Sequence, residues 1–264
     1  MSDCVAQCAW PRLSEPHATA LQCAVQFIFG EVDPLGIVAA GTIVRGTPHP
    51  TSDLDVYVVQ DAPFRRRVQR FFGAHVPTEI FINPPSAIRA YFAEEHDAGR
   101  PRTAHMLATG YVVFQRGPEL DRLRQEAQEW LARQSFPNEA AAIRARYAAA
   151  TTFEDAADVA DDDPATASML IAYAVIAMLE GWCRAKTGRI PRRKDLLARV
   201  ADLDPAVGAL GRRVFVDPSF AEREAAAAEI ADMTIGVRGF FEWDSGAEAV
   251  TNAPANQTRG LPGA

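Results

Sequence analysis

The sequence contains few cysteines, and no two of them have metal-binding spacing. The four cysteines lie at positions 4, 8, 23 and 183 without a Cys-x-x-Cys motif, so nothing indicates a zinc site of that kind. Free thiols are the simplest interpretation, and they are typical of the reducing cytoplasm. No apolar run reaches the length of a membrane span, and Asp3 lies where a secretory signal carries cations. We therefore expect a cytoplasmic protein with no membrane partner.

Positive charge is also scarce. The 264 residues carry 27 basic and 34 acidic side chains, for a formal net charge of −7, and lysine occurs only at 186 and 194. This balance argues against a broad nucleic-acid-binding surface. The obvious local cluster of basic residues is Arg65, Arg66, Arg67 and Arg70. An apolar share of 48% and a charged share of 23% fit a soluble globular protein of one or two domains.

The first half of the chain predicts a mixed sheet with helices. Residues 14–32 show an apolar stripe at helical spacing behind Ser14, a favourable N-cap. Residues 64–72 fit either a helix or a strand, and a strand that pairs with residues 79–82 across the turn 73–77 fits slightly better. That strand would place Arg65 and Arg67 on one face, either as a triphosphate contact or as a solvated charge run. The other expected strands are 37–40, 53–59 and 111–114, and the other expected helices are 42–45, 86–95, 102–109 and 121–133.

After residue 135 the sequence becomes rich in alanine and almost entirely helical. Short connections between long helices favour an antiparallel bundle. We expect its helices at 138–160, 165–187, 194–202, 205–215 and 218–241. The predicted fold class is therefore α+β, with an N-terminal domain at 14–134 and a C-terminal helical bundle at 135–246. Residues 1–13 and 247–264 are expected to be disordered.

Two aspartates in the first half give the strongest chemical signal. Asp53 and Asp55 are two residues apart in an expected strand, so both carboxylates point to the same face while Leu54 and Val56 point to the core. Carboxylate oxygens are the ligands that Mg²⁺ prefers. Glu79, at the start of the next apolar segment, could reach the same ions if its strand lies beside the first.

A glycine turn precedes these carboxylates. Gly41 allows the backbone to approach a phosphate closely, and Thr42 adds a hydroxyl donor. If Thr42 opens a short helix, its free N–H groups also favour phosphate. Acidic residues beside such a turn suit nucleotidyl transfer, in which two Mg²⁺ ions offset the charge on the attacking and leaving oxygens.

The combined pattern resembles the DNA polymerase β-like nucleotidyltransferase superfamily, in its minimal and aminoglycoside-modifying branches. The resemblance covers residues 14–115 and includes Gly41-Thr42, Arg45-Gly46 and Ser52-Asp53-Leu54-Asp55, with threonine where the family has serine or glycine. It implies that two Mg²⁺ ions are held by Asp53, Asp55 and Glu79. It also implies that ATP or another nucleoside triphosphate is bound by Gly41, Thr42, Arg45 and Ser52.

Two-domain members of this superfamily that resemble the chain hold the acceptor with their helical domain. In the helical part of this chain, the resemblance makes Glu180 a candidate site residue. It is the only charged residue between Met169 and Cys183, on the helical face of Met169 and Tyr173. Glu180 is either the base that takes the acceptor proton or a helix-end carboxylate that reaches solvent. His105 fits a packed or surface histidine better than a catalytic one. Arg192, Arg193 and Lys194 follow Pro191 and fit a solvated turn better than a phosphate contact.

The resemblance predicts a Mg²⁺-dependent nucleotidyltransferase of the EC 2.7.7 type. Its reaction moves a nucleoside monophosphate, most simply AMP from ATP, to an acceptor hydroxyl. The acceptor could be a small molecule such as an aminoglycoside, since an acidic protein suits a cationic acceptor. One alternative is an antitoxin-like enzyme that attaches AMP to a protein partner. Another is a nucleotide-binding sensor without catalysis.

Overall fold

The computed structural model describes residues 2–49 and 51–247, which form two compact units. Unit 1 contains the described residues up to Pro137 together with Glu180–Val200. Unit 2 contains Asn138–Leu179 and the described residues from Ala201 onward. The boundary expected near residue 135 lies close to Pro137, whereas the segment Glu180–Val200 belongs with the sheet-containing unit.

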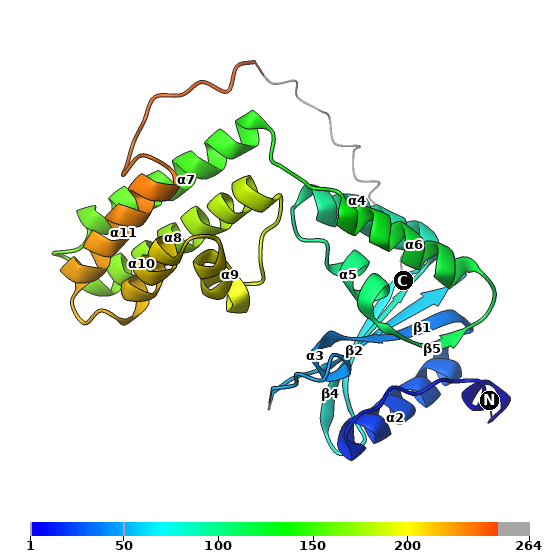
Figure 1. The fold of residues 1–264 in the computed structure, drawn as a ribbon. Coiled ribbons are helices and arrows are strands. Elements are labelled where there is room, and N and C mark those ends of the chain that lie inside the picture. The colour runs from blue at the N-terminus through cyan, green and yellow to red at the C-terminus, as the bar shows by residue number, and fades with distance from the viewer. Residues whose placement is uncertain (1, 50, 248–264) are drawn as a thin grey trace, which may run out of the picture. The chain divides into compact units, whose positions relative to one another are not determined.

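Unit 1 is built on a five-stranded mixed sheet with the strand order β3-β4-β2-β1-β5 (Figure 1). Strands β2 and β4 are parallel, and the other neighbouring pairs are antiparallel. The strands are β1 Pro34–Ala40, β2 Leu54–Gln60, β3 Arg66–Phe72, β4 Val76–Asn83 and β5 Tyr111–Gln115. The predicted mixed sheet is confirmed.

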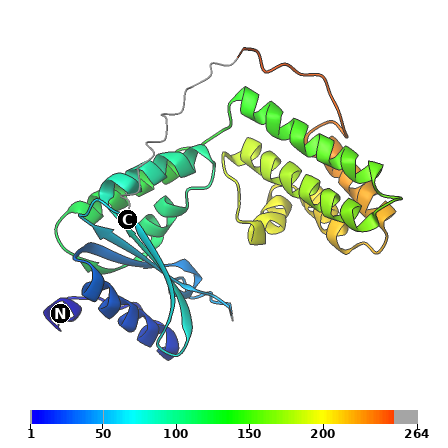
Figure 2. The ribbon, with the colours of Figure 1, turned by 180° about the vertical axis from the view of Figure 1, so that it is seen from behind.

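Helices cover both faces of this sheet (Figure 2). One face packs on α2, and the other packs on α4, α5 and α6. Within β2, Leu54 and Val56 belong to the core beneath α2, whereas Tyr57 and Val59 belong to the core on the other face. Because strand residues alternate faces, Asp55 shares the face of Tyr57. These helices are α2 Glu15–Glu31, α4 Pro85–Asp97, α5 Arg102–Thr109 and α6 Glu119–Ala132.

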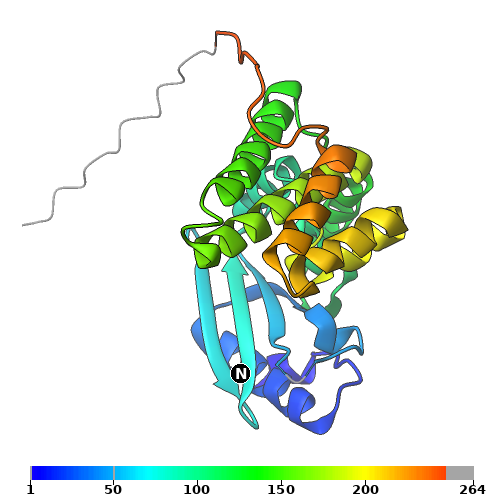
Figure 3. The ribbon, with the colours of Figure 1, turned by 90° about the vertical axis from the view of Figure 1, so that its left-hand side faces the viewer.

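The ambiguous segment 64–72 is a strand, because it contains β3, which pairs antiparallel with β4 (Figure 3). The arginines divide between its two faces as the strand interpretation predicts. Arg66 forms an ion pair with Glu31 of α2 at 2.6 Å. On the opposite face, Arg67 forms an ion pair with Glu79 at 2.7 Å. The charged edge strand therefore places one arginine beside an expected metal ligand.

The described part of the segment 1–13 is structured, although the sequence predicts disorder there. It begins with α1, Ser2–Ala6. The Ala9 amide donates a hydrogen bond to the Val113 carbonyl at 2.8 Å, and Trp10 and Leu13 pack against the core. These contacts follow no helical or strand-like period, so no periodic pattern in the sequence signals them. The expected disorder at 247–264 falls outside the described residues except at Ala247.

The described chain from Glu139 onward is mainly helical, which confirms the α+β class with a C-terminal helical part. Asn138 caps the first of these helices, since its side chain accepts the Ala141 amide at 2.8 Å. Ser219 and Glu222 form a capping box at the last. The helices are α7 Glu139–Asp158, α8 Pro164–Thr187, η1 Arg193–Asp195, α9 Leu196–Leu203, α10 Pro205–Val216 and α11 Phe220–Thr234.

Helix α11 ends at Thr234 rather than at the predicted residue 241. Gly236 adopts a left-handed conformation with φ of 70°, and its amide donates to the Ala231 carbonyl at 2.7 Å, which closes the helix. The aromatic residues after this stop belong to a different contact: Phe240 and Phe241 pack around Tyr147 of α7. In the sequence, the spacing of these apolar residues resembles that of a helix that continues, so the predicted helix end was wrong.

Helix α8 differs from the expectation that no apolar run reaches the length of a membrane span. By length and composition alone, it is the one helix among the described residues that is long and apolar enough to cross a membrane. It has 24 residues, and its most apolar window of 18 residues has a mean hydropathy of 1.5. The core helices of soluble proteins satisfy the same criterion, and 39% of its most apolar window is buried within the protein. The helix is therefore weak evidence for a membrane.

Candidate active site

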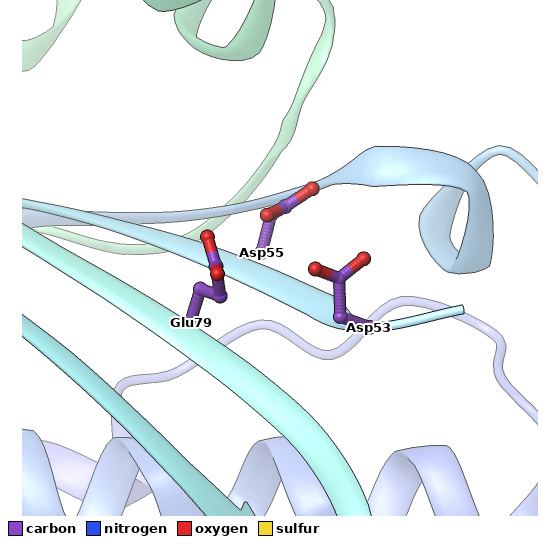
Figure 4. Close-up of side chains that lie close together, drawn as sticks. All are labelled: Asp53, Asp55 and Glu79. Carbon is purple, nitrogen blue, oxygen red and sulfur yellow. The ribbon is translucent and has the colours of Figure 1, made fainter. Parts of the chain in front are cut away.

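Three carboxylates meet at one end of the central strands (Figure 4). Asp55 and Glu79 are register partners in the parallel pair β2–β4, and Asp53 lies two residues before Asp55. One carboxylate oxygen from each residue lies within 4.8 Å of the others. Parallel register thus brings together the acids that the sequence marks, and we call this group the acidic floor.

The acidic floor concentrates negative charge. Burial, the largest effect, and the charges of Asp53 and Glu79 together raise the pKa of the Asp55 carboxyl to about 6, against the opposing effects of Arg45 and Arg67. Ionised Asp55 is therefore disfavoured when nothing offsets its charge. A divalent cation would relieve this repulsion, and an all-oxygen donor set suits Mg²⁺.

The backbone beside the floor requires glycine. Gly41 begins the short helix α3, Gly41–Val44, directly after β1, and has φ of +87°. A Cβ atom at this position would lie 2.6 Å from Asp55 Oδ2, so a side chain would collide with the carboxylate. Gly41 therefore leaves the oxygen open to a ligand, which agrees with the expected close approach of the backbone. The donor set and this opening fit a bound divalent metal.

The side chains of Thr42 and Ser52 form a hydrogen bond with each other. Their hydroxyl oxygens are 3.0 Å apart, and Ser52 Oγ also accepts the His49 amide at 2.8 Å. Thr42 lines the cleft described below, whereas Ser52 is absent from its lining. The observed contacts of Ser52 thus tie the loop before β2 to α3.

Glu79 is shared between the acidic floor and the edge strand. Its carboxylate accepts hydrogen bonds from Arg67 at 2.7 Å and from Gln69. The Arg67 guanidinium also lies over the Phe81 ring, 5.1 Å from its centroid. A small cavity of about 280 Å³ opens beside Asp53, Gln69 and Glu79. Each Glu79 oxygen thus accepts one hydrogen bond and keeps a lone pair with which it could bind a metal.

A larger cleft of about 1320 Å³ lies within unit 1 in front of the acidic floor. Gly41, Thr42, Arg45, Asp53 and Asp55 line its inner side. The facing side is strongly basic, and we call it the basic wall. The basic wall consists of Arg100, Arg102, Arg192, Arg193, Lys194 and Arg199.

The two segments of the basic wall are joined by hydrogen bonds. The Ile190 amide donates to the Gly99 carbonyl at 2.9 Å, and Arg100 Nη1 donates to the Pro191 carbonyl at 3.2 Å. Arg189 donates to the Leu131 carbonyl at 2.8 Å. These bonds fix the loop that carries Arg192 and Arg193 beside the α4–α5 connection.

Glu180 lies behind this wall and pairs with it. Its Oε1 is 2.7 Å from Arg100 Nη2 and 3.6 Å from Arg193 Nε, and its side chain is 16% exposed. The carboxylate does not line the cleft. These contacts orient two wall arginines and differ from the contacts expected of a base that faces the acceptor.

His105 does line the cleft, between the acidic floor and the basic wall. Burial lowers the pKa of its imidazole, and the nearby charges of Arg45 and Arg192 lower it further. The neutral ring therefore prevails at pH 7, and its titration reports the positive potential inside the cleft.

Sequence reasoning named the inner side of the cleft but only part of its facing side. It gave no role to Arg100, Arg102, Arg199 or Gln69, and it interpreted residues 192–194 as a solvated turn. The available signal was the recurrence of basic residues beside proline, in Arg100-Pro101-Arg102 and in Pro191-Arg192-Arg193-Lys194. No local pattern shows that these two stretches meet.

Among known proteins, this chain resembles solved structures only, and one of them is described below. The sequence matches no protein-family model and no curated protein. The structure is similar to the crystal structure of a nucleotidyltransferase-like protein from Exiguobacterium sibiricum 255-15, with 13% sequence identity and a TM-score of 0.47. The match covers 82% of this chain and 73% of that chain. At this level of similarity, conclusions about function depend on the geometry of the cleft.

Proposed function

We propose that the chain is a divalent-metal-dependent nucleotidyltransferase. An acceptor hydroxyl oxygen attacks the α-phosphorus of a nucleoside triphosphate, most simply ATP, and the hydroxyl proton passes to solvent. The bond to the bridging oxygen breaks, pyrophosphate leaves, and the acceptor carries the nucleoside monophosphate. The observation that carries the proposal is the convergence of Asp53, Asp55 and Glu79 within 4.8 Å beside a backbone opening that only glycine permits.

The acidic floor supplies the ligands. Asp53, Asp55 and Glu79 would hold Mg²⁺ through carboxylate oxygens. Two such ions, when bound, offset negative charge on the attacking and leaving oxygens. Gly41 lets the phosphates approach the backbone, and Arg45 adds a guanidinium at the same end of the cleft.

The role that we propose for Glu180 is positioning rather than proton transfer. Its carboxylate already faces Arg100 and Arg193, and it does not line the cleft. Glu180 therefore holds two arginines in place for a ligand that occupies the cleft.

Transfer of label from α-³²P-labelled nucleoside triphosphates tests the proposal. The acceptor panel contains phosphorylated, neutral and cationic small molecules, together with a cell lysate. The combined Asp53→Asn and Asp55→Asn variant should lose transfer by at least about 10³-fold, since all metal-dependent charge stabilisation is lost. The matched control Asp61→Asn removes an exposed carboxylate just after β2 and should retain activity.

The outcomes separate the proposed function from its alternatives. Undiminished transfer by the double variant would contradict the proposal. Label on a lysate protein instead of a small molecule would favour the protein-modifying alternative. Calorimetric binding of Mg²⁺ and ATP without transfer to any member of the panel would favour a nucleotide sensor.

A further inference from the structure

The charge of the cleft is opposite to the charge of the protein. The chain carries a formal net charge of −7, yet seven of the side chains that line the cleft are basic, namely Arg45 and the six members of the basic wall. Only Asp53, Asp55 and Asp195 contribute carboxylates to the lining. A ligand in the cleft therefore meets a local potential that the net charge does not describe.

Only part of this positive charge is neutralised internally. Asp195 pairs with Arg192 at 2.5 Å, and Glu180 contacts Arg100 and Arg193. Within the described chain, no carboxylate lies at ion-pair distance from Arg45, Arg102 or Lys194. Arg199 is set aside because it has a partner of its own. If the charges of Asp195 and Glu180 are set against the other six lining cations, about four positive charges remain.

The donor of the proposed reaction does not cancel this excess. A nucleoside triphosphate carries about four negative charges, and two divalent ions bring four positive ones. With the three carboxylates of the acidic floor, this assembly carries about three negative charges. About one positive charge in the cleft lining is left without a counter-ion. The cleft of about 1320 Å³ also exceeds the volume of about 300–1,000 Å³ usual for one small ligand.

We infer that the acceptor is an anionic, phosphate-bearing small molecule rather than a cationic one such as an aminoglycoside. Planar guanidinium groups bind phosphate oxygens in pairs, and the hydrogen-bonded loop at Ile190–Pro191 presents such groups opposite the acidic floor. This inference rests on the proposed function and specifies its acceptor. A polycationic acceptor would be repelled by the same side chains.

Calorimetry on the full chain tests the inference in two steps. The first titration adds α,β-methylene-ATP with Mg²⁺, which binds if the proposed donor site exists. The second adds inorganic phosphate, or kanamycin as a cationic probe, to the complex that results. We expect phosphate to bind and kanamycin to give no binding. The phosphate titration is repeated without the analogue, so that the basic wall is examined even if the donor site fails.

Charge reversal assigns the phosphate to the basic wall. The variant Arg192→Glu with Arg193→Glu should weaken phosphate binding by about tenfold or more and leave binding of the analogue within about twofold. Arg192→Gln with Arg193→Gln should give a smaller loss of the same sign, and it serves if the reversed variant folds poorly. The control Arg212→Glu with Arg213→Glu changes another adjacent pair, outside the cleft lining, and should leave phosphate binding unchanged.

Failure of the inference is distinct from failure of the proposed function. Absence of analogue binding would contradict the donor site. Analogue binding followed by binding of kanamycin but not of phosphate would overturn the anionic acceptor alone. Phosphate binding that is insensitive to both the reversed and the neutral variants would also overturn it.

Discussion

The acidic floor and the basic wall of the cleft differ in how their charges are held. The floor uses short side chains on or next to paired strands, so register places Asp55 opposite Glu79. The wall uses long side chains on loops and short helices, and Arg193 is 74% exposed. This difference indicates a division of labour. The floor is suited to a fixed geometry such as metal coordination, and the wall to a ligand whose shape its side chains can follow.

The floor is also the more costly region for stability. The raised pKa of Asp55 reflects its burial and its repulsion by Asp53 and Glu79, both of which cost stability. The exposed arginines of the wall are solvated by water and carry a smaller cost. Functional sites commonly carry such a cost. Substitutions in the floor should therefore have large effects, and substitutions around it should have smaller ones.

After the double aspartate variant, the largest effect is expected from Gly41→Ala. The added methyl group would lie 2.6 Å from Asp55 Oδ2 at a φ of +87°, so the carboxylate must move. Nucleotidyl transfer should fall by about 10²-fold, and the free energy of unfolding should fall by about 1–3 kcal/mol. Transfer kinetics and chemical denaturation measure these two effects.

Gly46→Ala is the matched control. Gly46 has a similar φ of +78°, but nothing lies within 4 Å of an added Cβ. It should share the strain without the loss of transfer. Equal loss of activity in both variants would mean that backbone strain, rather than contact with Asp55, explains the effect.

The next effect concerns stability without metal. Asp55→Asn should raise the free energy of unfolding at pH 7 by up to about 3 kcal/mol, because it removes a buried charge that repels Asp53 and Glu79. The pKa of Asp55 lies above its ordinary value of 3.8, at about 6. The contribution of Asp55 to the free energy of unfolding is thus fully present below pH 3.8, and it is lost as the pH rises through 6.

Denaturation in EDTA at several pH values checks this sign. The natural chain should lose stability relative to Asp55→Asn between about pH 4 and pH 6, and the difference should remain constant above that range. A natural chain that becomes more stable than the variant on the same rise in pH would contradict the charge crowding of the floor.

A smaller effect is expected where the floor meets the edge strand. Arg67→Ala should strengthen Mn²⁺ binding by about two- to fivefold, the range of an exposed ion pair, because Glu79 no longer shares its charge with a guanidinium. Arg66→Ala removes the pair with Glu31 on the other face of β3 and should leave the affinity unchanged. Weaker Mn²⁺ binding in Arg67→Ala would instead indicate that Arg67 positions Glu79 for the metal.

The smallest effect concerns the pKa of His105, which depends on charges from both sides of the cleft. Arg192→Gln removes one of the charges that lower the pKa of its imidazole, so the pKa should move upward toward its ordinary value. NMR titration of the His105 ring measures the change, and His17, outside the cleft lining, serves as the internal reference. A downward shift, or an equal shift of both histidines, would argue against a positive potential specific to the cleft.

The acidic floor could be predicted from sequence because its signals are local. Asp53 and Asp55 share one face by strand alternation, and Glu79 lies in a later apolar segment. Parallel pairing then placed Asp55 and Glu79 in register. The strand at 66–72 was less certain, because its exposed arginines give no core-facing pattern.

The basic wall could not be predicted, because its parts meet only in the folded chain. Arg100 and Pro191 are 91 residues apart in the sequence and are joined by one hydrogen bond. Neither stretch shows a period that indicates its partner. The same limit applies to the segment at 2–13, where isolated contacts of Trp10 and Leu13 provide order without a repeating pattern.

Anomalous diffraction from crystals grown with Mn²⁺ and α,β-methylene-ATP tests the central claim most directly. The account predicts manganese density within about 2.5 Å of carboxylate oxygens of Asp53, Asp55 and Glu79, with the triphosphate beside Gly41. Nucleotide bound elsewhere, or a floor that stays free of manganese while the nucleotide is bound, would contradict it.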